Sequence, residues 1–380
     1  MKKENIIIYH NIPAPYRIPI FNGLKNIYNV TLVYYEKEDK TRKWIENLST
    51  SNHEYHFCNN IRLKILRKTI VISVPPLKIL LRKNISSIII LENPSNIITS
   101  TILTMYYKIK NKKIISWTGN FPTYNGNIPN KRMTAVLSKL QGIVYKNSDK
   151  ILVYGKHTEN FLNSKFNVPL EKCILGTQGY PEVLLPTNIE ELIHDRNINI
   201  KKIHEKNRLC FIGYLRSHPN KGLDRLINFL KKNNIKNVYI DVIGDGPQRN
   251  YLEKISCGLN FKFHGHLEGD RKYSILSQSK ALILPSETDS WGWVVNESSA
   301  LNVPVLCSEK VMAKEIIEKE NNGKIFDIEN EESFTEAIKW ISEISIDDYI
   351  EICKISGKAY KNYNQDYPLN AFMKALKNET

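Results

Sequence analysis

Short runs of consecutive apolar residues alternate along the chain with longer segments in which apolar residues recur every three or four positions. Runs of the first kind are typical of strands buried on both faces, and segments of the second kind are typical of amphipathic helices. In the first half, we expect strands at 5–9, 30–35, 85–91, 114–117 and 150–153. In the second half, we expect them at 209–212, 239–243, 261–267, 281–284 and 303–306. Strands and helices that alternate in this order build parallel sheets with helices on both faces, so the pattern predicts an α/β protein.

Two helices and one junction complete this outline. Apolar residues recur at helical spacing across 131–146 and again across 223–231. Glycine and proline residues gather between 176 and 186, which is typical of a connection between domains. A chain of 380 residues, of which 42% are hydrophobic, is long enough for two cores. We therefore expect two Rossmann-like domains with doubly wound parallel sheets, at 1–182 and 183–362.

The segment 281–306, with the sequence ALILPSETDSWGWVVNESSALNVPVL, carries the clearest chemical signal. Its strand is expected to end at Pro285, and a helix is expected from about Val294. Asp289 lies in the loop between them, and Glu297 follows eight positions later. In a parallel sheet, ligands bind beyond the carboxyl ends of strands, where carboxylates accept hydroxyl hydrogen bonds and helix N–H groups attract phosphate. The segment therefore predicts a site for a ligand rich in hydroxyl groups, although a solvated acidic loop before a helix has the same pattern.

The same residues carry a resemblance to a known family. The stretch PS-x2-D-S-W-G-W-V-V-N-E resembles the Glu-x7-Glu signature of the retaining family 4 glycosyltransferases of the GT-B fold, with Asp289 in the first Glu position. The resemblance implies that Asp289 contacts hydroxyl groups of a donor sugar and that Glu297 binds the ribose hydroxyls of a nucleotide. It also implies donor-binding positions at Trp291, Gly292 and Trp293.

A second match follows the expected strand at 209–212. The family places two cations here that hold the donor diphosphate, and Lys221 stands where the family has its lysine. The family's arginine is replaced by Tyr214, and we expect Arg216 to supply the missing positive charge. A diphosphate carries about two charges and needs such cations. Lys221, Arg216 and Asp289 are therefore the expected catalytic residues, whereas a basic surface loop is the alternative if this segment is taken alone.

Two further segments follow in the family's order. Gly244 belongs to a Gly-Asp-Gly-Pro turn that resembles the family's Gly-x-Gly-Pro segment. His266 follows the glycine of 261–267, where the family contacts the nucleotide base. The resemblance implies donor-binding positions at both residues, and at Gly213 before Lys221. His266 and its neighbour two positions earlier could form a zinc pair, but no cysteine or carboxylate stands at ligand spacing, so we expect no metal.

Polar and aromatic residues at the strand ends of the first half are candidates for binding the acceptor. Asn11 and Arg17 lie in a segment that resembles the Pro-x-Pro-Tyr-Arg opening of bacterial polysaccharide-building members of the family. Glu92 follows the third expected strand, and Trp117 and Asn120 follow the fourth. Arg17 is expected to face an acceptor phosphate or the donor diphosphate, and Trp117 to stack on a sugar. A surface arginine at a helix start and a buried tryptophan at a strand end are equally common explanations.

As a whole, the resemblance implies a retaining glycosyltransferase of the GT-B fold, with two Rossmann-like domains facing across a cleft. It implies transfer of a sugar from a nucleoside diphosphate sugar to a glycan or lipid-linked acceptor, without metal or cofactor, in the biosynthesis of a cell-surface polysaccharide. In relatives the C-terminal helix packs back on the first domain, and we expect 363–380 to do so here. Two alternatives stay open: an epimerase of the same fold, and a non-catalytic basic adaptor of membrane surfaces.

Charge is distributed unevenly along the chain. Residues 1–185 contain 27 Lys and Arg against 11 Asp and Glu, giving +16, and 186–380 contain 27 against 28, giving −1, which together make the formal net charge of +15. The first half therefore predicts an anionic partner. No nucleic-acid recognition motif accompanies the charge, so we expect an anionic membrane or a lipid-linked pyrophosphate instead. The segment 61–83 concentrates basic and apolar residues, and its later part is predicted to lie in a membrane interface as an amphipathic stretch.

Cysteine usage and apolar runs indicate where the protein works. The six cysteines stand far apart without the spacing of metal or redox motifs, which is typical of reduced core residues. No apolar run reaches the roughly eighteen residues of a membrane-spanning helix. We therefore expect a cytoplasmic protein that binds the inner face of the cell membrane peripherally.

Overall fold

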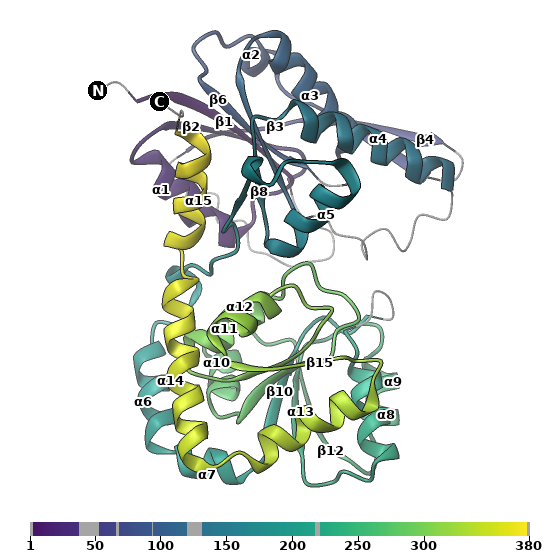
Figure 1. Cartoon of the computed structure of the whole chain (residues 1–380), viewed down its shortest axis with the longest axis vertical. Coiled ribbons are helices and arrows are strands. Elements are labelled where there is room, and N and C mark those ends of the chain that lie inside the picture. The colour runs from purple at the N-terminus through teal and green to yellow at the C-terminus, as the bar shows by residue number, and fades with distance from the viewer. Residues whose placement is uncertain are drawn as a thin grey trace. The chain divides into compact units, whose positions relative to one another are not determined.

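The computed structural model describes residues 3–37, 53–65, 68–92, 94–119, 131–216 and 221–377. The chain forms two compact units: unit 1 contains Met1–Pro181 and Gln365–Thr380, and unit 2 contains Glu182–Asn364. Each unit is built on a parallel sheet covered by helices (Figure 1). The prediction of an α/β protein with two Rossmann-like sheets is therefore confirmed.

Unit 1 is a doubly wound sheet whose first strand lies in the middle. Its parallel strands are β1 Asn5–His10, β2 Asn29–Tyr34, β3 Glu54–Phe57, β6 Ser87–Glu92, β7 Lys113–Thr118, β8 Lys150–Val153 and β9 Cys173–Leu175. Its helices are α1 Ile18–Lys25, α2 Leu77–Leu80, α3 Ile97–Ile109, α4 Lys131–Asn147, α5 Lys156–Phe166 and α15 Asp366–Leu376. The strand order is β3-β2-β1-β6-β7-β8-β9. The order reverses between β1 and β6, and this place is the unit 1 switch point.

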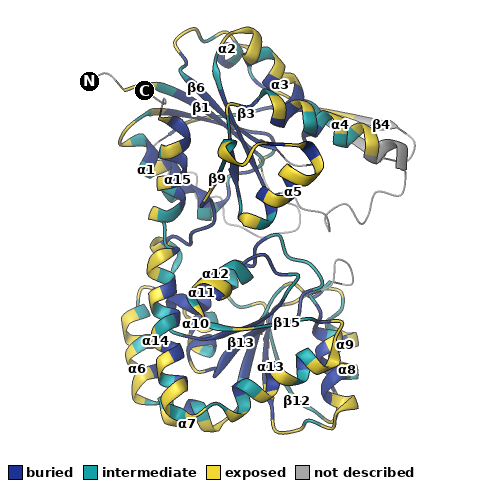
Figure 2. Cartoon of the chain, in the orientation of Figure 1, coloured by how far each residue is buried: buried dark blue, intermediate teal, exposed yellow. Residues whose placement is uncertain are grey.

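Each face of this sheet forms its own core. Along β1, Ile6 and Ile8 pack with α1 and α15, whereas Ile7 and Tyr9 pack with α3. Successive residues of a strand point to opposite faces, so a strand covered on both sides reads as a continuous apolar run. Figure 2 shows the strands of both sheets largely in the colour of buried residues. This burial explains why these strands could be expected from the sequence.

Helix α15 belongs to unit 1 although it follows unit 2 in the chain. It packs beside α1, and Phe372 and Leu376 join the core on that face of the sheet (Figure 1). Lys113 Nζ donates hydrogen bonds to the carbonyl oxygens of Leu376 and Lys377 at 3.1 and 2.7 Å. The ammonium group thereby satisfies carbonyl groups at the helix end that have no partner within the helix.

Unit 2 repeats the same winding. Its parallel strands are β10 Arg208–Ile212, β11 Tyr239–Ile243, β12 Asn260–Gly265, β13 Ala281–Leu284, β14 Val305–Ser308 and β15 Gly323–Phe326. Its helices are α6 Ile189–Ile198, α7 Ile200–Glu205, α8 Leu223–Lys232, α9 Arg249–Ile255, α10 Gly269–Ser277, α11 Val294–Ala300, α12 Lys314–Glu320, α13 Glu331–Glu343 and α14 Ile346–Asn362. The strand order is β12-β11-β10-β13-β14-β15. The order reverses between β10 and β13, which defines the unit 2 switch point.

The segment 61–83, whose later part is predicted to lie in a membrane interface, contains strand residues followed by a short helix. Strands β4 Asn59–Ile65 and β5 Lys68–Val74 form a two-stranded antiparallel ribbon, and the four-residue helix α2 follows. Residues 66–67, and the side chains of 63–65 and 68–70, lie outside the described part of the structure. In the part that is described, none of the helices combines the length and the apolar content that crossing a bilayer requires.

Candidate functional site

The loops that follow β10 and β13 meet at the unit 2 switch point. The two strands are neighbours in the sheet, so their carboxyl ends lie side by side. Sheets of this kind bind ligands beyond the carboxyl ends of the strands at such a point. The two loops hold Lys221 and Asp289, which are 68 positions apart in the chain. The topology thus brings together two residues that the sequence motifs had placed separately.

An ion pair joins the two loops. Lys221 Nζ donates a hydrogen bond to Asp289 Oδ2 at 2.5 Å, and the side chains are 20% and 19% exposed. The other carboxylate oxygen of Asp289 accepts a hydrogen bond from the backbone N–H of Trp291 at 3.2 Å. Hydrogen bonds between charged groups are shorter and stronger than those between neutral ones. In this structure the lysine and the acid therefore neutralise each other at the edge of solvent.

Gly222 explains how Lys221 comes so close to β13. The residue has a φ of +74°, and a Cβ at this position would lie 1.5 Å from the carbonyl oxygen of Pro285. Glycine adopts this conformation without steric cost and lets two backbones approach closely. The two residues of the Lys-Gly pair therefore act together. The glycine permits the close approach of the two loops, and the lysine forms the ion pair between them.

Asp289 is held by a neighbouring loop. Its backbone N–H donates to the carbonyl oxygen of Lys310 at 3.1 Å, and its own carbonyl oxygen accepts from the N–H of Met312 at 3.1 Å. Gly292 has a φ of +98°, and a Cβ there would lie 2.8 Å from Val311 Cγ1. The acid therefore has a defined position, and the long, flexible Lys221 side chain is the partner through which the pair can open.

The two tryptophans of the motif have different places. Trp291 is buried, and its indole N–H donates to Asn296 Oδ1 at 2.9 Å. Trp293 is partly exposed and directly precedes α11. Trp291 thus anchors the loop on the helix, whereas Trp293 keeps part of its surface open to solvent.

A second ion pair joins helices α10 and α11. Lys272 Nζ donates to Glu297 Oε2 at 2.8 Å, and the two side chains are 15% and 8% exposed. Burial lowers the pKa of Lys272, but the Glu297 carboxylate and the Tyr273 side chain together raise it by more, so the net shift is upward. Lys272 therefore keeps its positive charge inside the unit. Each acid of the motif has a lysine as its partner.

Sequence reasoning missed Lys272. The residue belongs to no motif, and its partner Glu297 lies 25 positions later on another helix. One signal was available: Lys272 stands one helical turn before the buried Leu276, so the two residues share a side of α10. A lysine on the inward side of an amphipathic helix needs an acidic partner, because burying an unpaired charge is costly.

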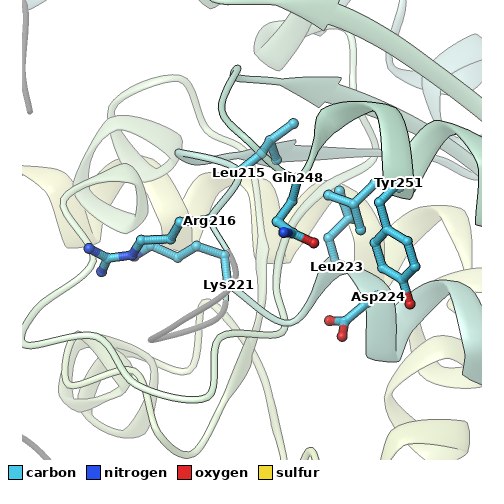
Figure 3. Close-up of a pocket in the computed structure, with 8 residues that line it drawn as sticks. Leu215, Arg216, Lys221, Leu223, Asp224, Gln248 and Tyr251 are labelled. Atoms are coloured by element: carbon cyan, nitrogen blue, oxygen red, sulfur yellow. The ribbon is translucent and has the colours of Figure 1, made fainter. Parts of the chain in front are cut away.

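A cavity of about 280 Å³ opens beside the loop that follows β10 (Figure 3). It is lined by Leu215, Arg216, Lys221, Leu223, Asp224, Gln248, Tyr251 and Leu252. Arg216 and Lys221 extend in the same direction, away from Asp224 and Tyr251. The residues 217–220 between these two cations lie outside the described part of the chain. The two cations expected to bind a diphosphate therefore border one cavity.

Gly213 and Gly244 let the loops after β10 and β11 touch. Gly244 has a φ of +147°, and a Cβ there would lie 1.9 Å from the carbonyl oxygen of Gly213. The N–H of Gly213 donates to the carbonyl oxygen of Ile243 at 3.0 Å. Because neither glycine has a side chain, the backbones of these two loops can lie in contact beside the switch point.

The two histidines of β12 and its following loop do not converge. His264 Nε2 lies 2.7 Å from Asp241 Oδ1, and its side chain is largely buried. His266 is exposed, and its Nε2 lies 3.0 Å from Glu268 Oε1. Among the residues that the structure describes, no group of three histidine, cysteine or acidic side chains is arranged to hold a metal ion.

Arg17 and Trp117 lie in the core of unit 1 and not on a surface. Arg17 is 2% exposed, its Nη1 donates to the carbonyl oxygen of Thr177 at 2.7 Å, and its guanidinium lies 4.5 Å from the ring centroid of Trp117. Trp117 is fully buried, and Phe372 packs edge-on against it. A cation over an aromatic face is stabilised by the ring electrons. The expected acceptor contacts of both residues are thus not supported by their positions, because protein groups cover them.

Glu92 is also an internal residue. It is 1% exposed and accepts hydrogen bonds from Tyr145, from Thr118 Oγ1 at 3.1 Å and from Gln141 Nε2 at 3.3 Å. Burial raises the pKa of Glu92, although these hydrogen bonds offset part of the shift. The hydrogen bonds of Glu92 therefore connect β6 with β7 and α4.

The remaining two acceptor candidates have different positions. Asn11 is partly exposed, and its Oδ1 is a buried atom without a hydrogen-bond partner. Buried polar atoms in proteins nearly always have a partner, so this oxygen marks a place where a donor group would be favoured. Asn120 lies outside the described residues.

Residues 194–361 match the model of a family described as glycosyl transferases group 1. The chain is 26% identical to the sulfoquinovosyl transferase SQD2 of Arabidopsis thaliana over 160 residues. This matched segment makes up 42% of this chain and 31% of the plant protein. The chain is also 26% identical to an uncharacterized glycosyltransferase of Methanocaldococcus jannaschii over 187 residues. This matched segment makes up 46% of each of the two chains. The matched segments therefore span about a third to about half of the length of these relatives.

The fold has relatives among solved structures. The crystal structure of Anabaena HepE in complex with UDP superposes with a TM-score of 0.71 and 12% identity, over 98% of this chain and 99% of that one. At this identity the likeness concerns the fold alone. The fold is GT-B, as expected from the sequence.

Proposed function

We propose that the chain, whose residues 194–361 match the family model described as glycosyl transferases group 1, moves a sugar from a nucleoside diphosphate sugar to a glycan or lipid-linked acceptor. The observation that carries the proposal is the meeting of Lys221 and Asp289 at the unit 2 switch point. An ammonium group suits a phosphate, and a carboxylate suits sugar hydroxyls. Their proximity supports roles for Lys221 at the diphosphate and for Asp289 at the sugar of the same nucleotide sugar.

The proposed roles follow from these contacts. Lys221 and Arg216 stabilise the diphosphate as it leaves, which is charge stabilisation where charge develops. Asp289 accepts hydrogen bonds from hydroxyls of the donor sugar, and Glu297 from the ribose hydroxyls. Lys272 orients the Glu297 carboxylate through the hydrogen bond between them. The departing phosphate takes the proton of the acceptor, and the anomeric configuration is retained without a metal ion or cofactor.

The first test is nucleotide binding followed by transfer. HepE was solved with UDP, so UDP is the first nucleotide to try, with GDP second. Ligand at 100 times its dissociation constant adds about 2.7 kcal/mol to the free energy of unfolding, which thermal unfolding detects easily. A labelled nucleotide sugar should then pass its label to an added acceptor, and NMR of the product should show retained configuration. An inverted product would refute the retaining mechanism.

Two other functions give different results in the same assays. An epimerase would change the sugar while it stays on the nucleotide, so the label would never reach an acceptor. A non-catalytic adaptor would show neither nucleotide stabilisation nor transfer. The Lys221–Asp289 pair favours the transferase over the adaptor, because an adaptor has no use for an ion pair at a ligand-binding strand end.

The acceptor side of the proposal rests on charge. Residues 1–185 have a formal charge of +16, which suits an acceptor that carries phosphate, such as a lipid-linked pyrophosphate. We propose the assembly of a surface polysaccharide as the setting. A phosphorylated acceptor should therefore compete with inorganic polyphosphate for the protein, and a neutral acceptor should not.

A further inference from the structure

Unit 1 carries an exposed apolar face on two helices. Ile102, Met105 and Ile109 on α3 are 55%, 42% and 80% exposed. Their spacing of three and four positions places them on one side of the helix. Leu77 at the start of α2 and Leu81 directly after this helix are 67% and 59% exposed. These five residues are called the docking face below.

The two helices lie side by side. Tyr106 of α3 donates a hydrogen bond from its hydroxyl group to the carbonyl oxygen of Leu80 at 2.6 Å. Lys110 Nζ donates to the same oxygen at 3.1 Å. Exposed residues follow both helices in Figure 2. The docking face is therefore one surface and not two separate patches, and contiguous exposed apolar surface on a soluble protein marks an interaction site.

The surroundings of the docking face are strongly basic. Residues 77–113 contain seven Lys and Arg and a single acid, Glu92, which is buried. Of the seven, Arg82 pairs with Glu54, and Lys113 bonds to carbonyl groups at the end of α15. Lys78, Lys83 and Lys108 are among the exposed cations. Exposed apolar side chains surrounded by lysines are typical of protein surfaces that bind the interface of an anionic bilayer.

We propose that the docking face binds the surface of an anionic lipid bilayer. The aliphatic side chains enter the boundary between headgroups and acyl chains, and the lysines contact lipid phosphates. A second copy of this chain would bring the exposed lysines of one docking face against those of the other, which costs free energy. Nucleic acid would gain nothing from exposed leucine and isoleucine, because it is bound through aromatic stacking and cations. This inference goes beyond the proposed sugar transfer and does not depend on it.

Vesicle sedimentation tests the proposal. The full chain should bind vesicles of equal parts phosphatidylglycerol and phosphatidylcholine, and should bind pure phosphatidylcholine far more weakly. Binding should decrease as salt is added, because high ionic strength screens lysine–phosphate attraction. Equal binding to both kinds of vesicle would overturn the electrostatic part of the proposal.

Two variants divide the two contributions. Each lysine near an anionic surface contributes roughly fivefold in affinity, so the combined change Lys78→Glu, Lys83→Glu and Lys108→Glu should weaken binding by roughly a hundredfold or more. The combined change Ile102→Ser, Met105→Ser and Ile109→Ser should remove the binding that persists in high salt. All six side chains are exposed, so thermal unfolding should stay close to that of the parent protein.

Matched controls come from unit 2. Lys201→Glu, Lys202→Glu and Lys206→Glu make the same charge change on exposed positions, and Ile198→Ser and Val183→Ser remove exposed apolar side chains. These variants should bind vesicles nearly as well as the parent protein. Losses as large as those of the docking-face variants would show that net charge or overall apolar surface is responsible, and the proposal would be wrong.

Two other results would also contradict it. If the serine variant changes the oligomeric state in light scattering and leaves vesicle binding unchanged, the docking face is an interface between copies. If both docking-face variants bind vesicles as the parent protein does, the membrane contact lies elsewhere. Transfer of sugar to a soluble acceptor should be the same in all variants, so loss of docking and failure of the proposed transfer are seen in separate assays.

Discussion

The two switch points have the same topology and opposite chemistry. In unit 2, Lys221 and Asp289 meet at the edge of solvent, with their side chains about one-fifth exposed. In unit 1, Arg17 is buried over the ring of Trp117, and His10 packs against the same ring. The order in which strands join a sheet therefore decides which loops meet. Local side chains then decide whether a charge faces a ligand or is stabilised inside the protein.

The largest expected effect is on the stability of unit 1. Hydrogen bonds to charged groups contribute about 1.5–3 kcal/mol each, and Arg17 donates to Thr177 and to Gln178. Arg17→Ala should therefore lower the free energy of unfolding by about 3 kcal/mol or more, measured by urea denaturation. Arg62→Ala removes an exposed cation of the same unit and should cost about 0.5 kcal/mol or less. Equal effects of the two variants would show that Arg17 is not a structural residue.

The second effect is on catalysis and concerns unit 2. Lys221→Ala removes a cation from the leaving diphosphate, so kcat/KM should fall roughly ten- to a hundredfold, as expected for a charged contact of about 1.5–3 kcal/mol. Arg225 is the matched control, because it pairs with Glu287 of the same β13 loop at 3.0 Å and is 41% exposed. Arg225→Ala should retain kcat/KM within about twofold. A Lys221→Ala variant that is as active as this control would end the assignment.

The third effect is a pH dependence of unit 1. Burial and the nearby Arg17 guanidinium lower the pKa of His10 to about 3, whereas its ordinary value is 6.5. Between these two pH values, His10 is protonated in the unfolded chain and neutral in the folded chain. The free energy of unfolding therefore decreases as the pH falls below 6.5. From pH 7 to pH 5 the loss should be about 2 kcal/mol. His10→Gln should make this loss smaller, measured as urea midpoints at both pH values, and an equal loss in the variant would contradict the role of His10.

The smallest effect distinguishes the two acids. Asp289→Asn releases Lys221 from its partner, so free nucleotide should bind up to roughly fivefold more tightly, since an ion pair near the surface is worth up to about 1 kcal/mol. Transfer should nevertheless fall, because the sugar loses its carboxylate. Glu297→Gln should weaken free nucleotide instead. Calorimetry measures both affinities, with Glu287→Gln as a control, and equal weakening by both substitutions would show that the division of roles is wrong.

The central strands of both sheets and the edge strand β12 could be predicted, whereas the edge strands β3, β9 and β15 could not. Strand β13 was expected at 281–284 and is observed there, because burial on both faces gives a continuous apolar run. Strands β3, β9 and β15 lie at sheet edges, have three or four residues and are partly exposed. Short, half-buried strands leave no clear alternation or run in the sequence. Short length combined with partial exposure therefore decided which strands could not be predicted.

The site was predictable where one loop carries several residues, and not where partners come from distant elements. Asp289 and Glu297 stand on one loop and the helix that follows it, so their spacing was a usable signal. Lys272 reaches Glu297 from another helix, and no local pattern announces that contact. The burial of Trp117 was equally hidden, because a tryptophan at a strand end has the same sequence whether its ring points outward or into the core.

The position of α15 has a consequence for synthesis. Unit 1 is interrupted in the chain by the whole of unit 2, and its core includes Phe372, which packs against Trp117. On the ribosome, unit 2 can therefore finish folding while unit 1 still exposes the apolar groove that α15 will fill. Unit 1 is expected to spend the translation of nearly two hundred residues in an incomplete, chaperone-dependent form, since domains emerge at roughly 5–20 residues per second.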